Sequence, residues 1–273
     1  MSEPELRRIV VACDAACDIR VAVEDAANLA ARWKASLHGI FLEDENLFRL
    51  ADLPFGRQAM LSSALSEGLN RAEIERLSSA SGAAMRRALR DVAMRRGLEW
   101  SFGIVRDLPG VAALARFEAD MLVVEAATRP FSGSWRPRSA WDALAEGRGR
   151  TVLMRRRRRS GPGTVVMLLD GGAARDKVLS SGLALVAPGD DVVLLMGAHS
   201  AAESVAVTEA AESLGRTLGP KIRAASMAPE KAALFRQIER LDPTLIVIDA
   251  AAVERSFIDD VCARTRADIL TVG

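Results

Sequence analysis

Residues 8–14, Arg-Ile-Val-Val-Ala-Cys-Asp, decide the fold: an apolar run ends in a carboxylate and leads directly into a segment with helical spacing. The pattern recurs at residues 164–170, Thr-Val-Val-Met-Leu-Leu-Asp, again followed by small residues and a helical pattern. Unbroken apolar runs of this length are typical of strands buried on both faces of a parallel sheet that helices cover. The recurrence indicates two copies of one α/β unit.

The composition limits the function classes. A chain of 273 residues is long enough for two domains of ordinary size. A formal net charge of +1 produces no overall electrostatic field that would attract nucleic acid or membranes. The absence of Tyr argues against a surface on which nucleic-acid bases stack. The first residues lack the basic-then-apolar order of a signal peptide, and no apolar stretch approaches the ~20 residues of a membrane span. We therefore expect a cytoplasmic protein.

The first half alternates strands and helices. Residues 46–69 form a connection longer than compact α/β units usually carry, and they predict either a flap or docking element or a short helix packed on the domain's own edge. The expected elements are a strand at 8–13, a helix at 17–33, strands at 36–42, 99–105, 121–124 and 150–154, a long helix at 71–96 that ends at Gly97, a short helix from Pro109, and a helix capped by Ser139.

Five consecutive arginines, Arg155–Arg159, precede Ser-Gly-Pro-Gly at 160–163. Such a run either contacts phosphates or forms a self-repelling, solvated exit from a strand into a linker. The near-zero net charge favours the linker, so we expect domains at 1–159 and 160–273, the second shorter than the first.

The second half repeats the parts with shorter connections. Ser256-Phe-Ile-Asp259 repeats the serine/acid spacing of a capping box that Ser139 begins in the first half. Ser139 precedes Val152 by the same number of residues as Ser256 precedes Ile269, which supports an internal repeat. The expected elements are helices at 174–185, 202–218 and from 229, with strands at 192–196, 221–228, 245–249 and around 269.

This order of elements resembles the universal stress protein family in its tandem two-domain form. The resemblance covers nearly the whole chain and rests on the strands that end in Asp14 and Asp170, on residues 119–124 (Ala-Asp-Met-Leu-Val-Val), and on the serine-capped last helices. It implies two doubly wound α/β domains, each with a parallel five-stranded sheet of order 3-2-1-4-5. It also implies a ligand site between the carboxyl ends of strands one and four, and pairing of the two fifth strands, around Met154 and Leu270.

In nucleotide-binding members of that family, the Asp after strand one contacts adenosine, and a glycine-rich loop after strand four, G-x2-G-x9-G-[ST], holds the phosphates with backbone N–H groups. Placed on the first half, its three glycines fall on Glu125, Thr128 and Arg138, and only the hydroxyl of Ser139 matches. Placed on the second half, the first two fall on Asp249 and Ala252, and the loop is too short to complete the pattern before Ser256.

The acids at these positions oppose phosphate binding. Two like charges ~4 Å apart repel by about 4 kcal/mol at an effective dielectric constant of ~20. Micromolar binding amounts to only about 8 kcal/mol in total. Unless a cation such as Arg138 pairs with the acid, we expect that neither half binds ATP in the family manner, and we expect no cofactor.

Other residue groups leave alternatives open. Two facing pairs of acids are expected, Asp14 with Glu125 and Asp170 with Asp249. Each pair could hold a divalent cation or raise the pKa of one of its two carboxyl groups. Alternatively, each acid bonds to loop amides, and because we favour this alternative, we predict no metal site. Cys13 and Cys17 also have two interpretations. They could form a redox-sensing pair, because a helix N-terminus favours the thiolate form of a nearby cysteine, or they could be two small buried side chains. His38 and His199 have no second ligand at zinc spacing, so we do not expect a zinc site. The sequence also contains no nucleophile motif, so we do not expect an enzyme.

These observations favour a non-catalytic stress-response or signalling module that acts through protein partners, a homodimer or an altered small ligand. The alternative is a nucleotide-binding switch with slow ATP hydrolysis in the first half, in which Asp14 still holds adenosine. A third reading, more weakly supported, is a hydrolase or ligase of the wider adenine-nucleotide α-hydrolase group.

Overall fold

The computed structural model describes residues 6–15, 17–45, 48–49, 71–107, 119–125, 151–155, 161–169, 175–197, 205, 209 and 221–273. The chain divides into two compact units, one of Leu6–Glu146 and one that contains Gly147–Gly273. Each unit is described by itself below.

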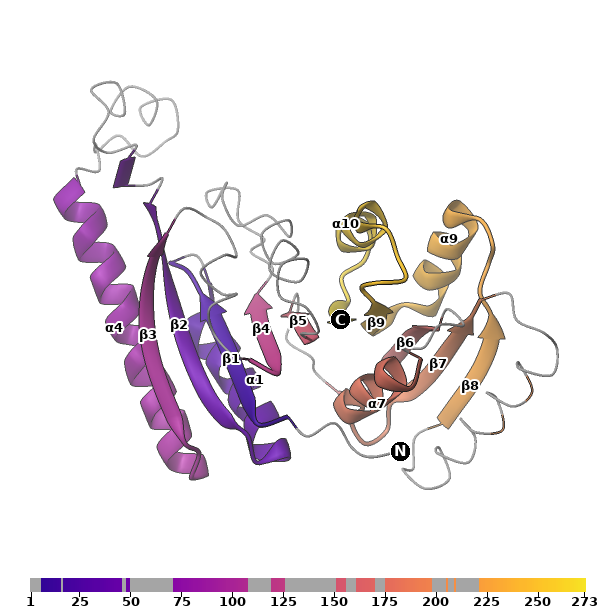
Figure 1. Cartoon of the computed structure of the whole chain (residues 1–273), viewed down its shortest axis with the longest axis horizontal. Coiled ribbons are helices and arrows are strands. Elements are labelled where there is room, and N and C mark those ends of the chain that lie inside the picture. Colours follow the sequence, from indigo (N-terminus) through magenta and orange to yellow (C-terminus); the bar gives the residue numbers. More distant parts are fainter. Residues whose placement is uncertain are drawn as a thin grey trace. The chain divides into compact units, whose positions relative to one another are not determined.

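The first unit holds a parallel sheet of order β3-β2-β1-β4 (Figure 1). This agrees with the order that the resemblance implies for strands one to four. Its described elements are β1 (Arg8–Cys13), α1 (Ile19–Trp33), β2 (Ser36–Asp44), α4 (Arg71–Arg96), β3 (Trp100–Asp107) and β4 (Met121–Glu125).

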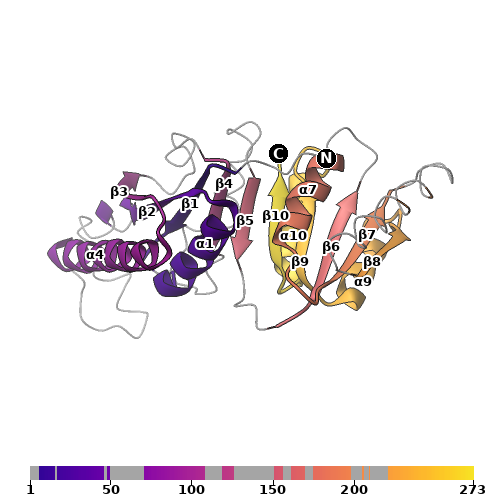
Figure 2. The same ribbon diagram turned by 90° about the horizontal axis from the view of Figure 1, so that it is seen from below.

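The core of this unit lies between the sheet and two helices. Residues Ile9–Cys13 of β1 are at most 1% exposed, as expected for a central parallel strand. The helices α1 and α4 lie side by side on one face of the sheet (Figures 1 and 2). Gly39 allows the close approach of α4, because a Cβ atom there would lie 2.7 Å from Leu89 Cδ2. Gly97 ends α4 with a φ of 65°, as the sequence predicts.

The second unit holds a sheet of order β5-β10-β9-β6-β7-β8. The strands β6 to β10 therefore have the expected order 3-2-1-4-5 and run parallel. The helix α7 covers one face, and α9 and α10 cover the other, where Phe235 and Phe257 stack at 5.2 Å (Figures 1 and 2). The described elements are β5 (Thr151–Arg155), β6 (Thr164–Leu169), α7 (Arg175–Leu185), β7 (Asp191–Met196), β8 (Lys221–Ser226), α9 (Lys231–Leu241), β9 (Pro243–Asp249), α10 (Arg255–Arg264) and β10 (Asp268–Val272).

The two fifth strands pair as the resemblance implies. β5 runs antiparallel to β10, with Met154 opposite Ile269 and Leu153 opposite Leu270. This pairing is the reason that β5 groups with the second unit although it ends the first repeat. The predicted boundary at 159/160 stays a prediction, because residues 156–160 lie outside the described part of the chain.

The arginine run differs from expectation at its first member. Arg155 is not a solvated side chain: its side chain is 18% exposed, and its guanidinium forms a 3.0 Å ion pair with Asp268, whose side chain is 5% exposed. The acid across the strand pair gives this arginine a buried partner, which the run of arginines alone could not indicate.

Several expected elements lie outside the described residues: the helices from Pro109 and Ser139, and most of 46–69 and 202–218. The strands β2 and β3 run beyond their predicted ends, to Asp44 and Asp107, and an ion pair between Glu43 and Arg106 joins them there. In the described part of the chain, no helix is both long enough and apolar enough to cross a membrane.

Candidate functional site

The expected switch point of the first unit lies at the carboxyl ends of β1 and β4. β1 lies between β2 and β4, and Ala12 is opposite Val124 in the β1–β4 register. The backbones of Asp14 and Glu125 therefore leave the sheet at the same edge, where sheets of this order bind ligands. The side chain of Glu125, and the residues Thr128, Arg138 and Ser139, lie outside what the structure describes.

Asp14 holds the turn that leads from β1 to α1. Its Oδ1 atom accepts a hydrogen bond of 3.0 Å from the backbone N–H of Cys17, and its carbonyl oxygen accepts a longer one of 3.3 Å from the same group. The helix that follows is capped separately, because Asp18 accepts from the N–H of Val21. Asp14 thus has the geometry of an acid that bonds to a loop amide.

In the second unit, Asp249 is the residue on which the sequence comparison with the family motif places the first phosphate-loop glycine. Its Oδ1 atom accepts a 2.9 Å hydrogen bond from the N–H of Ala251, and its carbonyl oxygen accepts from the N–H of Ala252 at 3.3 Å. The N–H of Ala250 donates to the carbonyl of Val272 at 2.9 Å. Three consecutive amides after β9 are therefore already bonded within the protein.

The partner that the sequence predicts for Asp249 is Asp170, which lies outside the described residues. The register of β6 and β9, with Leu168 opposite Ile248, brings the strand ends that precede both acids to one edge. In the described ranges, no group of three His, Cys, Asp or Glu side chains could hold a metal ion.

The predicted capping box at Ser256 is wrong. The helix α10 begins at Arg255, and its N-cap is Glu254, which makes no capping hydrogen bond with its side chain. Ser256 lies inside the first turn, is exposed, and donates to Glu254 Oε2 at 3.2 Å. The serine/acid spacing does not show at which residue the backbone first becomes helical. In this chain it does so at Arg255, one residue before the serine.

Cys13 and Cys17 lie in contact beside Asp14. Their Sγ atoms are 2.9 Å apart, with Cys17 as donor, and neither cysteine is in a disulfide. Cys13 is buried at the end of β1, whereas Cys17 is partly exposed before α1. The sequence predicted the proximity of this pair but not its contact.

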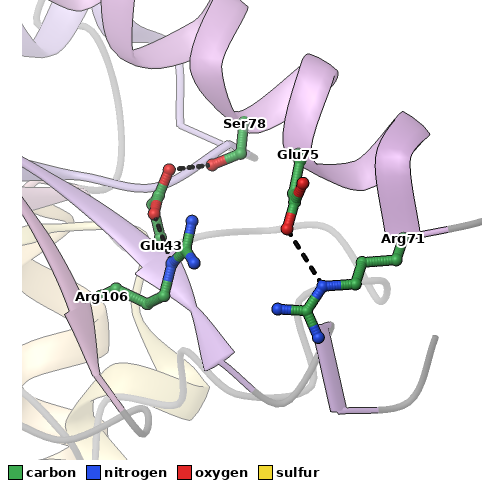
Figure 3. A network of polar contacts seen from close by, with 5 residues as sticks. All are labelled: Glu43, Arg71, Glu75, Ser78 and Arg106. Carbon is green, nitrogen blue, oxygen red and sulfur yellow. Dashed lines mark hydrogen bonds and ion pairs between the residues drawn. The ribbon is translucent and has the colours of Figure 1, made fainter. Parts of the chain in front are cut away.

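A polar network joins β2, β3 and α4 at the outer strands of the first sheet (Figure 3). Glu43, whose side chain is 10% exposed, accepts from Ser78 Oγ at 2.8 Å and from Arg106 Nε at 2.8 Å. The Arg106 guanidinium also lies 4.4 Å from the centre of the Phe48 ring. On α4, Arg71 and Glu75 form an exposed ion pair.

The sequence did not predict this network, although residues 43–45, Glu-Asp-Glu, form an acidic run at its position. It involves β2 and β3, whereas the switch point lies between β1 and β4. We therefore assign it a structural role, in which it ties α4 to the outer strands.

His38 is a second polar feature of the outer strands. Its Nδ1 atom lies within hydrogen-bond distance of Ser101 Oγ on β3. Burial, and then the positive charge of Arg8, lower the pKa of His38 below its ordinary value of 6.5. The neutral imidazole is therefore the form that the fold favours.

No protein-family model matches the sequence, and no curated protein sequence matches it. Solved structures do match over nearly the whole chain. A universal stress protein from Archaeoglobus fulgidus superimposes with a TM-score of 0.61 at 10% identity, covering 97% of this chain and 95% of that one. A structure described as a universal stress protein from Pseudomonas aeruginosa gives 0.60 at 15% identity, covering 98% and 93%. The chain has the universal stress protein fold.

The universal stress protein fold is not tied to one role. The cytoplasmic domain of a prokaryotic cation chloride cotransporter also matches, with a TM-score of 0.50 at 11% identity, covering 97% of this chain and 95% of that one. Because one fold serves several functions, the function of this chain has to be argued from its own residues.

Proposed function

We propose that this protein is a cytoplasmic stress-response or signalling module that is not an enzyme and that has lost the ATP phosphate loop of the family it resembles in both halves. It acts through contacts with protein partners or with a second copy of itself, or through a small ligand other than ATP.

The observation that carries this proposal is the bonding of the turn after β9. A phosphate bound there needs free backbone N–H groups. The N–H of Ala251 instead donates to the carboxylate of Asp249, and those of Ala250 and Ala252 donate to carbonyl oxygens. A phosphate would have to displace these bonds and approach a carboxylate, and both changes cost free energy.

In the first half, the support comes from the sequence and the strand register. Glu125 stands where the loop needs a glycine, and its backbone leaves β4 next to the end of β1. A side chain there also prevents the close backbone approach that a glycine allows.

Isothermal titration calorimetry of the full chain with Mg-ATP tests the proposal. We expect no binding at micromolar concentrations, because repulsion between one carboxylate and the phosphates removes two to three decades of affinity. The variant Asp249→Gly serves as comparison, since it removes the carboxylate and frees the amide of Ala251. Micromolar binding of Mg-ATP to the unmodified chain would contradict the loss of the loop.

The alternative function is a nucleotide-binding switch with slow ATP hydrolysis in the first half. The position of Asp14 supports it, because this carboxylate lies at the end of β1 next to β4, where the resemblance places the adenosine contact. A phosphate-release assay with wild type and Asp14→Ala separates the two functions. Hydrolysis that Asp14→Ala abolishes would favour the switch, and turnover at background level in both favours the non-catalytic module.

Native mass spectrometry of the purified chain tests the proposed partners. It reports the mass of any retained small ligand together with the oligomeric state. A dimer, or a co-purified ligand other than ATP, would support the proposal, and a retained ATP molecule would support the alternative.

A further inference from the structure

We propose that Cys13 and Cys17 form a reversible dithiol–disulfide pair at the β1–α1 turn, which hydroperoxides oxidise and small thiols reduce. This inference concerns the chemistry of the turn itself and does not depend on which ligand the neighbouring sheet edge binds.

The first support is the geometry of the two sulfur atoms. They are 2.9 Å apart in the reduced protein. An S–S bond measures ~2.05 Å, so the sulfurs need to approach by less than about 1 Å. The thiol of Cys17 donates to the sulfur of Cys13, so the two atoms that the disulfide would join are already in contact.

The second support is the difference in exposure between the two thiols. Cys17 is partly exposed and meets an oxidant first, whereas Cys13 is buried at the end of β1 and has direct access only to its neighbour. This matches the roles of an attacking thiol and a resolving thiol. Cys262 is also buried, and its thiol donates to the sulfur of Met154 at 3.9 Å.

The reaction balances in two steps. The Cys17 thiolate attacks one oxygen of a hydroperoxide, the O–O bond breaks, and an alcohol or water leaves while Cys17 becomes a sulfenic acid. Cys13 then loses its proton and attacks the Cys17 sulfur, forming the S–S bond and releasing water. The protein loses two protons and two electrons, which the hydroperoxide accepts as it is converted to an alcohol (or water) and water. A thiol reductant reverses the change by thiol–disulfide exchange.

Two electrostatic effects change the rate of Cys17 oxidation in opposite directions. The N-terminus of α1 begins just after Cys17 and favours a thiolate there. The carboxylates of Asp14 and Asp18 flank Cys17 and disfavour it, and Asp14 bonds directly to its backbone N–H. We therefore expect slower oxidation than at a helix N-terminus that lacks such acids.

The sequence makes the pair easy to detect. Trypsin cleaves after Arg8 and Arg20, so both cysteines fall in the single peptide 9–20, whereas Cys262 falls in peptide 256–264. The native full chain is treated with hydrogen peroxide, alkylated with iodoacetamide in denaturant, digested and analysed by mass spectrometry. We expect peptide 9–20 to lose two hydrogens and take no label, and prior reduction with dithiothreitol to restore two labels.

Two variants assign the roles. In Cys13→Ala the sulfenic acid of Cys17 has no resolving thiol and is trapped by dimedone, whereas in Cys17→Ser the buried Cys13 stays reduced. Cys262→Ala is the matched control and leaves the oxidation of peptide 9–20 unchanged. The proposal is overturned if peptide 9–20 keeps two labels at peroxide concentrations that trap Cys17 with dimedone in Cys13→Ala, or if wild-type Cys17 proceeds to the sulfinic acid without a disulfide.

Discussion

Asp190 is a buried acidic residue of the second unit whose carboxylate bonds to the backbone. It is 1% exposed, and its two carboxylate oxygens accept from the N–H groups of Gly163 at 2.9 Å and Ala187 at 2.6 Å. These bonds tie the start of β6 to the turn after α7. A carboxylate in this position stabilises the folded chain because it accepts hydrogen bonds from partly buried N–H groups that would otherwise lack an acceptor.

We expect Asp190→Ala to lower the free energy of unfolding by about 2–5 kcal/mol, since two partly buried amides lose a charged acceptor. Urea denaturation followed by circular dichroism measures the change. The neighbouring Asp191 is exposed at the start of β7, so Asp191→Ala is a matched control with an expected effect within about 0.5 kcal/mol. Equal effects of the two variants would show that the amide bonds of Asp190 contribute little.

His38 makes stability depend on pH. Because folding lowers the pKa of His38, the unfolded chain binds a proton more readily than the folded chain. Stability contributed by the neutral imidazole is therefore fully present well above its ordinary pKa of 6.5 and is lost as the pH falls through that value toward the lower pKa of the folded state.

Denaturation midpoints of wild type and His38→Gln between pH 7.5 and pH 5.5 test this sign. We expect the wild type to lose stability more steeply than the variant below about pH 6.5. A wild-type curve that is parallel to that of His38→Gln, or that rises toward acid pH, would show that His38 is not the responsible group.

At the scale of elements, the β5–β10 pair contains an ion pair removed from water. Arg155 and Asp268 are 18% and 5% exposed and lie 3.0 Å apart on neighbouring strands. Removing one partner of a buried pair is costly, whereas replacing both with apolar side chains of similar volume is often neutral. The pair therefore matters more for specifying how these two strands meet than for net stability.

We expect Arg155→Met to destabilise the chain by about 3–5 kcal/mol, because it leaves the buried carboxylate of Asp268 without this guanidinium. Asp268→Leu should cost less, since the longer arginine side chain can reach water. The double variant should recover most of the loss, giving a large coupling energy in a double-mutant cycle of denaturation free energies. Simple additivity of the two single changes would contradict the pairing.

The elements differ in how well the sequence predicts them. The apolar run of β1 and the helix α4 were placed correctly because period and composition are local signals, and Gly97 marked the end of α4. The expected cap at Ser256 failed because a capping motif does not fix where the backbone first becomes helical. Arg155 was misjudged because its partner, Asp268, is distant in the sequence.

At the scale of the whole molecule, the repeat was predictable and the site only partly so. Equal spacing of the last helix–strand units predicted two copies of one fold, and the strand order agrees with it. The sequence also predicts, through the family motif, that Asp249 falls at a glycine position. It could not show that this carboxylate bonds to Ala251, or that Cys13 and Cys17 touch, because both depend on the path of short turns.

The grouping of β5 with the second unit leads to a prediction about where the chain can be divided. A fragment of residues 147–273 retains the antiparallel pairing of β5 with β10, whereas a fragment of 160–273, cut at the boundary expected from sequence, loses it. The shorter fragment would leave β10 as an edge strand that pairs only with β9, and Asp268 without Arg155. We therefore expect 147–273 to unfold cooperatively and 160–273 to be less stable by about 3–5 kcal/mol and more prone to aggregate. Urea denaturation and size-exclusion chromatography of both fragments measure this difference, and a 160–273 fragment as stable and monodisperse as 147–273 would show that the second repeat folds without the fifth strand of the first.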